Sequence, residues 1–163
     1  MKNMKRSFFF ISLIALLPGC WESKKQEKKS GLVVVNVLDE ELYNDCHIKG
    51  SMNIPFEKVD ELADTIDKDA QVVIYCSNYQ CTSSEYAAKL LRTKGFSNVC
   101  VYEAGMAEWY QKGLPVEGER KKAYLKKTCS KLTQDESSDI PVISTNELAQ
   151  KMKISSQDAT TAA

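Results

Sequence analysis

The sequence has no excess of either charge and contains a single histidine. Its 163 residues include 22 Lys and Arg against 22 Asp and Glu. Such a balance gives no broad positive surface, so we expect no nucleic-acid partner. Because His47 is the only histidine, we find no cluster of metal ligands and expect no metal site. The length allows one domain with tails, not two independent cores.

The sequence also lacks an apolar run near its start that is long enough to span a bilayer. Residues 8–17 are apolar, but ten residues are too few, and basic residues precede them. This pattern predicts a signal peptide over residues 1–19. Residues 17–20 resemble the lipobox of bacterial lipoproteins, which predicts lipidation of Cys20. An ordinary signal peptide with an incidental Cys20 is the alternative.

Residues 20–31 then follow as the lipidated cysteine and a charged tether that cannot bury a core. We therefore expect an exported chain, anchored through Cys20 to a bacterial membrane on its periplasmic or cell-surface side. Of the six cysteines, five remain after lipidation of Cys20. An odd number leaves at least one thiol free or paired with another molecule.

The middle of the chain alternates aliphatic runs with helical patterns. Residues 32–37, 72–75 and 99–102 are near-continuous apolar runs, which are typical of parallel strands covered on both faces. Residues 57–66 and 84–94 show helical periodicity, and Gly95 ends the second helix. These patterns predict an α/β domain whose ligand sites lie beyond the carboxyl ends of the strands.

Cys76 lies at such a strand end, before a polar loop and a helix. Loop amides and the positive end of a helix favour a thiolate, which makes Cys76 a candidate nucleophile. Cysteine is also a common buried apolar residue, so a purely structural role is the alternative on local context alone.

Residues 33–117 resemble the rhodanese domain, and the similarity depends on the order and spacing of several motifs. They are residues 46–55, the loop after Tyr75, residues 95–99, residues 105–109 and residues 113–116. The resemblance implies an α/β rhodanese-like fold over residues 32–119. Its parallel sheet would have about five strands, with helices on both faces.

The resemblance also implies a sulfurtransferase that needs no cofactor. The Cys76 thiolate would take a sulfane sulfur from a small-molecule donor such as thiosulfate and pass it from a persulfide to a thiol or to cyanide. Loop amides would stabilise the anionic sulfur. His47 would be mainly structural. The substrate-binding loop would consist of Ser77, Asn78, Tyr79, Gln80, Cys81, Thr82 and Ser83.

The loop departs from the family pattern in its charge and in a second cysteine. No Arg or Lys lies between Cys76 and Ser84, which predicts weak attraction for thiosulfate. Cys81 could form a disulfide with Cys76 in an oxidising compartment, or could merely fill the place of an arginine. A redox protein using both cysteines and a catalytically silent binding module therefore remain as alternatives.

Residues 120–163 are predicted to form a basic helix, over residues 120–132, and a carboxyl-terminal tail. The family's opening segment is missing before residue 32, and residues 142–152 resemble it. We hypothesise that this tail folds back on the domain to supply the missing element. An unrelated tail or the start of another domain is the alternative. We expect a monomer.

Overall fold

The computed structural model describes residues 31–127, 129–130 and 139–154, apart from the side chains of Leu62 and Ala63. The predicted signal peptide and Cys20 lie outside these residues, as does part of the carboxyl-terminal tail. None of the helices in the described part of the chain is long and apolar enough to cross a membrane.

A parallel sheet of four strands forms the centre of the domain. In spatial order its strands are β3 (Met52–Asn53), β1 (Leu32–Asn36), β4 (Gln71–Tyr75) and β5 (Val99–Tyr102). Every pairing within it is parallel. The β-branched runs favour this structure because such side chains pack well on a sheet that is buried on both faces. The predicted parallel sheet is confirmed, with four strands instead of about five.

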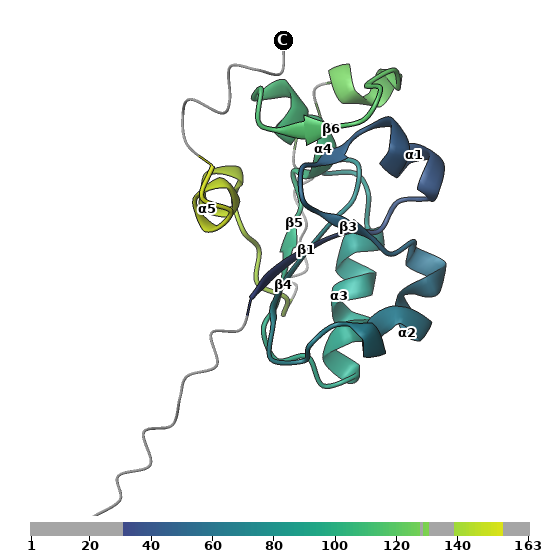
Figure 1. Cartoon of the computed structure of the whole chain (residues 1–163), viewed down its shortest axis with the longest axis vertical. Helices are drawn as coiled ribbons and strands as arrows, with labels where there is room; N and C mark the ends of the chain where they lie inside the picture. The colour runs from purple at the N-terminus through teal and green to yellow at the C-terminus, as the bar shows by residue number, and fades with distance from the viewer. Residues whose placement is uncertain (1–30, 128, 131–138, 155–163) are drawn as a thin grey trace, which may run out of the picture.

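Helices cover both faces of this sheet, as predicted. Figure 1 shows α2 (Val59–Leu62) and α3 (Ser83–Thr93) on one side and α5 (Thr145–Lys151) on the other. Alternate residues of β4 lie on opposite faces of the sheet. Val72 and Ile74 belong to the apolar cluster under α3. Val73 and Tyr75 join a second cluster, which includes residues of α4 (Gly105–Gln111) and α5.

Short elements complete the domain beside the main sheet. They are α1 (Glu40–Asp45), a two-stranded antiparallel pair of β2 (His47–Ile48) and β6 (Val116–Glu117), and the 3-10 turns η1 (Phe56–Lys58), η2 (Ala63–Thr65) and η3 (Ala123–Lys126). The side chain of Asp39 caps α1 by accepting a hydrogen bond from the amide of Leu42 at 2.8 Å.

The segment predicted as a helix over residues 57–66 is shorter and less regular in the structure. A single α-helical stretch, α2, lies between η1 and η2. Val59 and Ile66 are both buried, as expected for two residues seven positions apart on one face. A segment this short gains little stability from helix propensity alone. Its backbone conformation is therefore set by the burial of Val59 and Ile66.

The carboxyl-terminal segment packs against the free edge of β5. The amide of Val101 donates to the carbonyl of Pro141 at 2.9 Å, and the amide of Ile143 donates to the carbonyl of Val101 at 2.9 Å. Val142 thereby forms an isolated parallel bridge with Val101. Helix α5 follows at once, and Ser144 and Glu147 form a capping box at its start. Ile143 and Leu148 are buried in the second apolar cluster.

The predicted basic helix over residues 120–132 is wrong within the described residues. Only η3 is helical there, and Arg120 has a φ of 62°. Asp45 explains the difference, because its carboxylate accepts hydrogen bonds from the amides of Lys121 and Lys122 at 2.8 and 3.0 Å. With these bonds made, Arg120 has a positive φ and Lys122 is extended (φ −71°, ψ 133°), and neither conformation is helical. Residues 128 and 131–138 lie outside the described part.

Candidate active site

The end of strand β4 is fixed on one face by the side chain of Tyr75. Its hydroxyl accepts a hydrogen bond from the amide of Ile48 at 3.0 Å and lies 2.9 Å from the hydroxyl of Ser51. Burial raises the pKa of Tyr75 to about 12, so the phenol stays protonated. The next residue, Cys76, therefore leaves the strand from a fixed position and faces the cluster under α3.

The amino-terminal end of α4 holds the backbone of the loop after β4. The amide of Met106 donates to the carbonyl of Cys76, and the amide of Ala107 donates to the carbonyl of Ser77, both at 2.9 Å. Gly105 allows this close approach, since a Cβ atom there would lie 2.7 Å from the carbonyl oxygen of Cys76. Its φ of 65° also favours glycine.

Asn78 shapes the middle of the loop. Its carbonyl accepts from the amide of Cys81 at 3.0 Å, and its side-chain oxygen accepts from the amide of Gln80 at 2.9 Å. This turn carries the chain back so that Cys81 returns beside Cys76. Gln80 and Thr82 are exposed, whereas the other loop residues after Cys76 are half-buried.

The sulfur of Cys76 is fully covered by this loop and by the first turn of α3. Its Sγ lies 3.0 Å from the carbonyl oxygen of Cys81 and 3.3 Å from the hydroxyl oxygen of Ser84. The exposed fraction of Cys76 is 0%, and that of Ser84 is 2%. A donor molecule can therefore reach this sulfur only if the loop moves.

Cys81 is half-buried, and its thiol forms a hydrogen bond with that of Cys76. This bond and the amides of Ser83 and Ser77 hold the pKa of Cys81 well below its usual range, although burial opposes them. The same bond, with burial and the charge of Cys81, raises the pKa of Cys76. Two adjacent thiolates would repel each other, so only one of the two thiols ionises readily, and the pKa shifts favour ionisation of Cys81.

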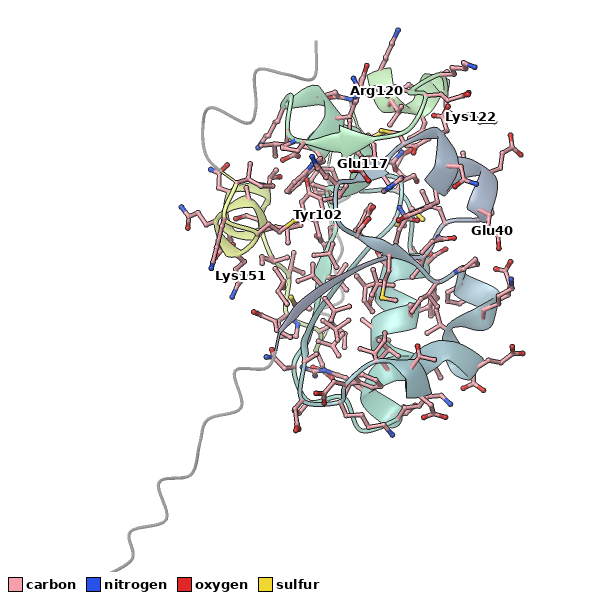
Figure 2. The ribbon with its side chains drawn as sticks, in the orientation of Figure 1. Glu40, Tyr102, Glu117, Arg120, Lys122 and Lys151 are labelled. Atoms are coloured by element: carbon pink, nitrogen blue, oxygen red, sulfur yellow. The ribbon has the colours of Figure 1, made fainter. Side chains whose placement is uncertain are left out.

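Glu108 connects the loop to the carboxyl-terminal segment. It accepts hydrogen bonds from the hydroxyl of Tyr79 at 2.9 Å and from the hydroxyl of Thr145, and it pairs with Lys112 at 2.9 Å. Burial and then Glu108 raise the pKa of Tyr79 to about 12. The hydroxyls of Thr145 and Tyr102 lie 3.0 Å apart, and Tyr102 reaches toward α5 in Figure 2.

A cavity of about 330 Å³ lies beside these residues, between the loop and α5. Its charged lining consists of Glu103, Glu108, Glu147 and Lys112. Carboxylates therefore outnumber cations there, so this side of the loop is unfavourable for a dianion. Within the described ranges, no group of three or more His, Cys, Asp or Glu side chains is placed to hold a metal ion.

The structure brings Cys76, Cys81, Ser77 and Ser83 together and leaves Gln80 and Thr82 at the surface. His47 lies elsewhere in the fold: its ring stacks on Tyr43, and its Nε2 is 3.4 Å from Glu117. These contacts are structural.

Four residues near the loop were not predicted as site residues. Ser84 could have been found from its place in the first turn of the helix after the loop. The other three lie in residues 105–109 and 142–152, which resemble family segments, but nothing local assigns them to the site: Gly105, Glu108 and Thr145.

Comparison with known proteins gives a consistent result. A family model described as the rhodanese-like domain matches residues 21–112, more than half of the chain. The chain is 30% identical over 82 residues to thiosulfate sulfurtransferase GlpE of Coxiella burnetii, covering 50% of this chain and 75% of that protein. It is 33% identical over 97 residues to the HTH-type transcriptional regulator Rv0324 of Mycobacterium tuberculosis, covering 59% of this chain and 42% of that protein.

Solved structures show the same fold. The BH2092 protein of Bacillus halodurans is 29% identical, with a TM-score of 0.52, covering 56% of this chain and 67% of that one. The rhodanese-like domain of the Alr3790 protein of Anabaena sp. is 31% identical, with a TM-score of 0.50, covering 55% of this chain and 89% of that one. From the family match, the parallel sheet and the cysteine loop at the end of β4, we conclude that the chain belongs to the rhodanese-like domain family.

Proposed function

We propose that this chain is a sulfurtransferase in which Cys76 carries a sulfane sulfur as a persulfide. The observation that carries the proposal is the placement of Cys76 at the carboxyl end of β4, against the first turn of α3 and in contact with the Cys81 thiol. The similarity to proteins named thiosulfate sulfurtransferase supports it.

Cys76 must lose its proton before it attacks, and the Cys81 sulfur beside it is the group through which this proton leaves. Cys76 passes its proton to the sulfur of Cys81 and attacks the sulfane sulfur of the donor. A new bond forms between the two sulfurs, and the bond from the sulfane sulfur to the rest of the donor breaks. The leaving group departs with the electron pair, as sulfite if the donor is thiosulfate. A thiol or cyanide then attacks the outer sulfur and restores the Cys76 thiolate.

The charges around the loop define the class of donor. No lysine or arginine lies between Cys76 and Ser84, and the nearby cavity carries three carboxylates and one lysine. A donor that carries one negative charge, or a charge delocalised over several atoms, fits these surroundings better than the dianion thiosulfate does. A small persulfide is such a donor. We propose that thiosulfate is a slow substrate of this protein.

Measurement of the released leaving group, sulfite from thiosulfate and pyruvate from mercaptopyruvate, tests the sulfurtransferase proposal, and intact mass spectrometry follows the protein. The reduced full chain is incubated with thiosulfate and then with mercaptopyruvate, and the same is done with Cys76→Ser. The proposal predicts the release of the donor's leaving group, one equivalent per chain, from the wild type and not from the variant. Absence of that release with both donors, in a folded wild-type protein, would contradict it.

We also propose that residues 1–19 are a signal peptide and that Cys20 is lipidated, which anchors the domain to a bacterial membrane. The basic residues before a short apolar run support this, together with the lipobox-like residues 17–20. Expression with a radiolabelled fatty acid tests it. The wild type should incorporate label and sediment with membranes, and Cys20→Ser should do neither; equal labelling would contradict the proposal.

A further inference from the structure

We propose that Cys81 is a resolving thiol, which attacks Sγ of the Cys76 persulfide, releases hydrogen sulfide and leaves a Cys76–Cys81 disulfide. This inference rests on the proposed function, since it requires a persulfide on Cys76. It goes further because it assigns a product and a reductive half-reaction to the site. When no acceptor molecule is present, the sulfur then leaves as free sulfide.

The position of Cys81 favours attack on Sγ of Cys76. Sγ of Cys76 lies 3.0 Å from the carbonyl oxygen of Cys81, and each thiol shifts the pKa of the other. The turn at Asn78 closes the loop through the Cys81 amide and brings residue 81 back beside residue 76. A persulfide on Cys76 therefore forms next to a second thiol on the same loop, at a high effective concentration.

The surroundings of Cys81 favour the ionised form that must attack. Amides of Ser77 and Ser83 donate to its sulfur, and Ser83 begins helix α3, which has eleven residues. These donors stabilise a thiolate at Cys81 by direct hydrogen bonding, and the positive end of the helix adds to them. Cys76 lacks the same exposure, since its sulfur is covered while Cys81 is only half-buried. Cys81 is therefore the sulfur from which a proton can leave to solvent.

The step balances without any other reactant. The Cys81 thiolate forms a bond to Sγ of Cys76 while the bond between Sγ and the outer sulfur breaks, and the outer sulfur leaves as HS⁻ with the electron pair. The outer sulfur is reduced and the Cys81 sulfur is oxidised. Another turnover needs an external dithiol reductant, which opens the disulfide by thiol exchange.

The experiment is a single turnover in the absence of oxygen. The full chain is reduced, freed of reductant and mixed with an excess of thiosulfate, and then sulfite, hydrogen sulfide, intact mass and the disulfide peptide map are followed with time. Cys81→Ser and Cys81→Ala are the test variants, and Cys76→Ser is included to show which cysteine takes up sulfur. Cys129→Ser is the matched control, because Cys129 lines a small cavity of about 70 Å³ together with Asn78 and Tyr79.

The proposal predicts that the wild type and Cys129→Ser release sulfite and then hydrogen sulfide, and end as a Cys76–Cys81 disulfide. The Cys81 variants should load sulfur more slowly and then hold it, with a stable gain of one sulfur atom and at least a tenfold loss in the rate of sulfide release. Circular dichroism checks that each Cys81 variant is folded. If only one of the two folds, the test is made with that variant.

Three results would overturn the inference, and they separate it from the proposed function. A stable persulfide in the wild type, without sulfide release, removes the resolving role and leaves the sulfurtransferase intact. A persulfide that accumulates on Cys81 in Cys76→Ser, with no loading of the Cys81 variants, reverses the two roles. Release of neither sulfite nor sulfide by any protein, with no release of pyruvate from mercaptopyruvate either, contradicts the sulfurtransferase proposal itself.

Discussion

Gly105 brings the first amides of helix α4 directly against the carbonyl group of Cys76. A Cβ atom at Gly105 would lie 2.7 Å from that oxygen and 2.7 Å from the backbone nitrogen of Asn78. The contact is between backbone atoms, which cannot move aside as the end of a flexible side chain can. The conformation of the cysteine loop therefore depends on one residue almost thirty positions further along the chain.

We expect Gly105→Ala to lower the free energy of unfolding by about 2–5 kcal/mol, because it adds an overlap to the strain of a positive φ. Urea denaturation measures the change. Gly50→Ala is the matched control: Gly50 has a φ of 81°, but nothing lies within 4 Å of its Cβ position. Gly50→Ala should lower the free energy of unfolding by only about 1–2 kcal/mol. Equal losses in the two variants would contradict the close contact with the loop.

The titration of Tyr79 should report the hydrogen bond to Glu108. The pKa of Tyr79 is raised to about 12, and the carboxylate of Glu108 contributes because it disfavours the phenolate. Glu108→Gln removes that charge, so the pKa of Tyr79 should fall toward its usual value of 10.0. Tyrosine titration by ultraviolet difference spectroscopy or NMR measures it. Glu103→Gln, whose charge acts without a hydrogen bond to Tyr79, should give a smaller fall; an equal fall would contradict the assigned bond.

The carboxyl-terminal segment should be an integral part of the domain. Leu148 of α5 is fully buried, so we expect Leu148→Ala to lower the free energy of unfolding by about 2–5 kcal/mol. Gln150→Ala, on the exposed side of the same helix, should change it by less than about 0.5 kcal/mol. Denaturant unfolding of both variants tests this. Wild-type stability of Leu148→Ala would mean that the helix does not contribute to the core.

A positive charge in the loop should improve the use of thiosulfate. Ser77 is half-buried at the start of the loop, and the loop has no cation of its own. We expect Ser77→Arg to raise kcat/KM for thiosulfate about tenfold, equivalent to about 1.4 kcal/mol of transition-state stabilisation. Steady-state release of sulfite in the presence of a dithiol reductant measures it, and the gain should shrink at high salt. The neutral control Ser77→Gln should show no such gain; an equal effect would contradict an electrostatic cause.

The sequence by itself determined the class of fold and the position of the candidate nucleophile. Continuous apolar runs such as residues 72–75 must be covered on both faces, which favours a parallel sheet between helices. A cysteine directly after such a run lies at the carboxyl end of a strand, and this placement of Cys76 needs no tertiary information. Two segments show the limit of such patterns. The backbone around α2 depends on the burial of Val59 and Ile66. The segment predicted as a basic helix is not helical where the carboxylate of Asp45 binds its amides.

Only the tertiary structure decided what surrounds Cys76. The amides of α4 that hold its loop, the carboxylate of Glu108 and the hydroxyl of Thr145 come from segments that no spacing rule connects with residue 76. The opposite pKa shifts of Cys76 and Cys81 depend on a turn that brings residue 81 back beside residue 76. Local periodicity reports which residues are buried, whereas the approach of distant backbones depends on how whole elements pack.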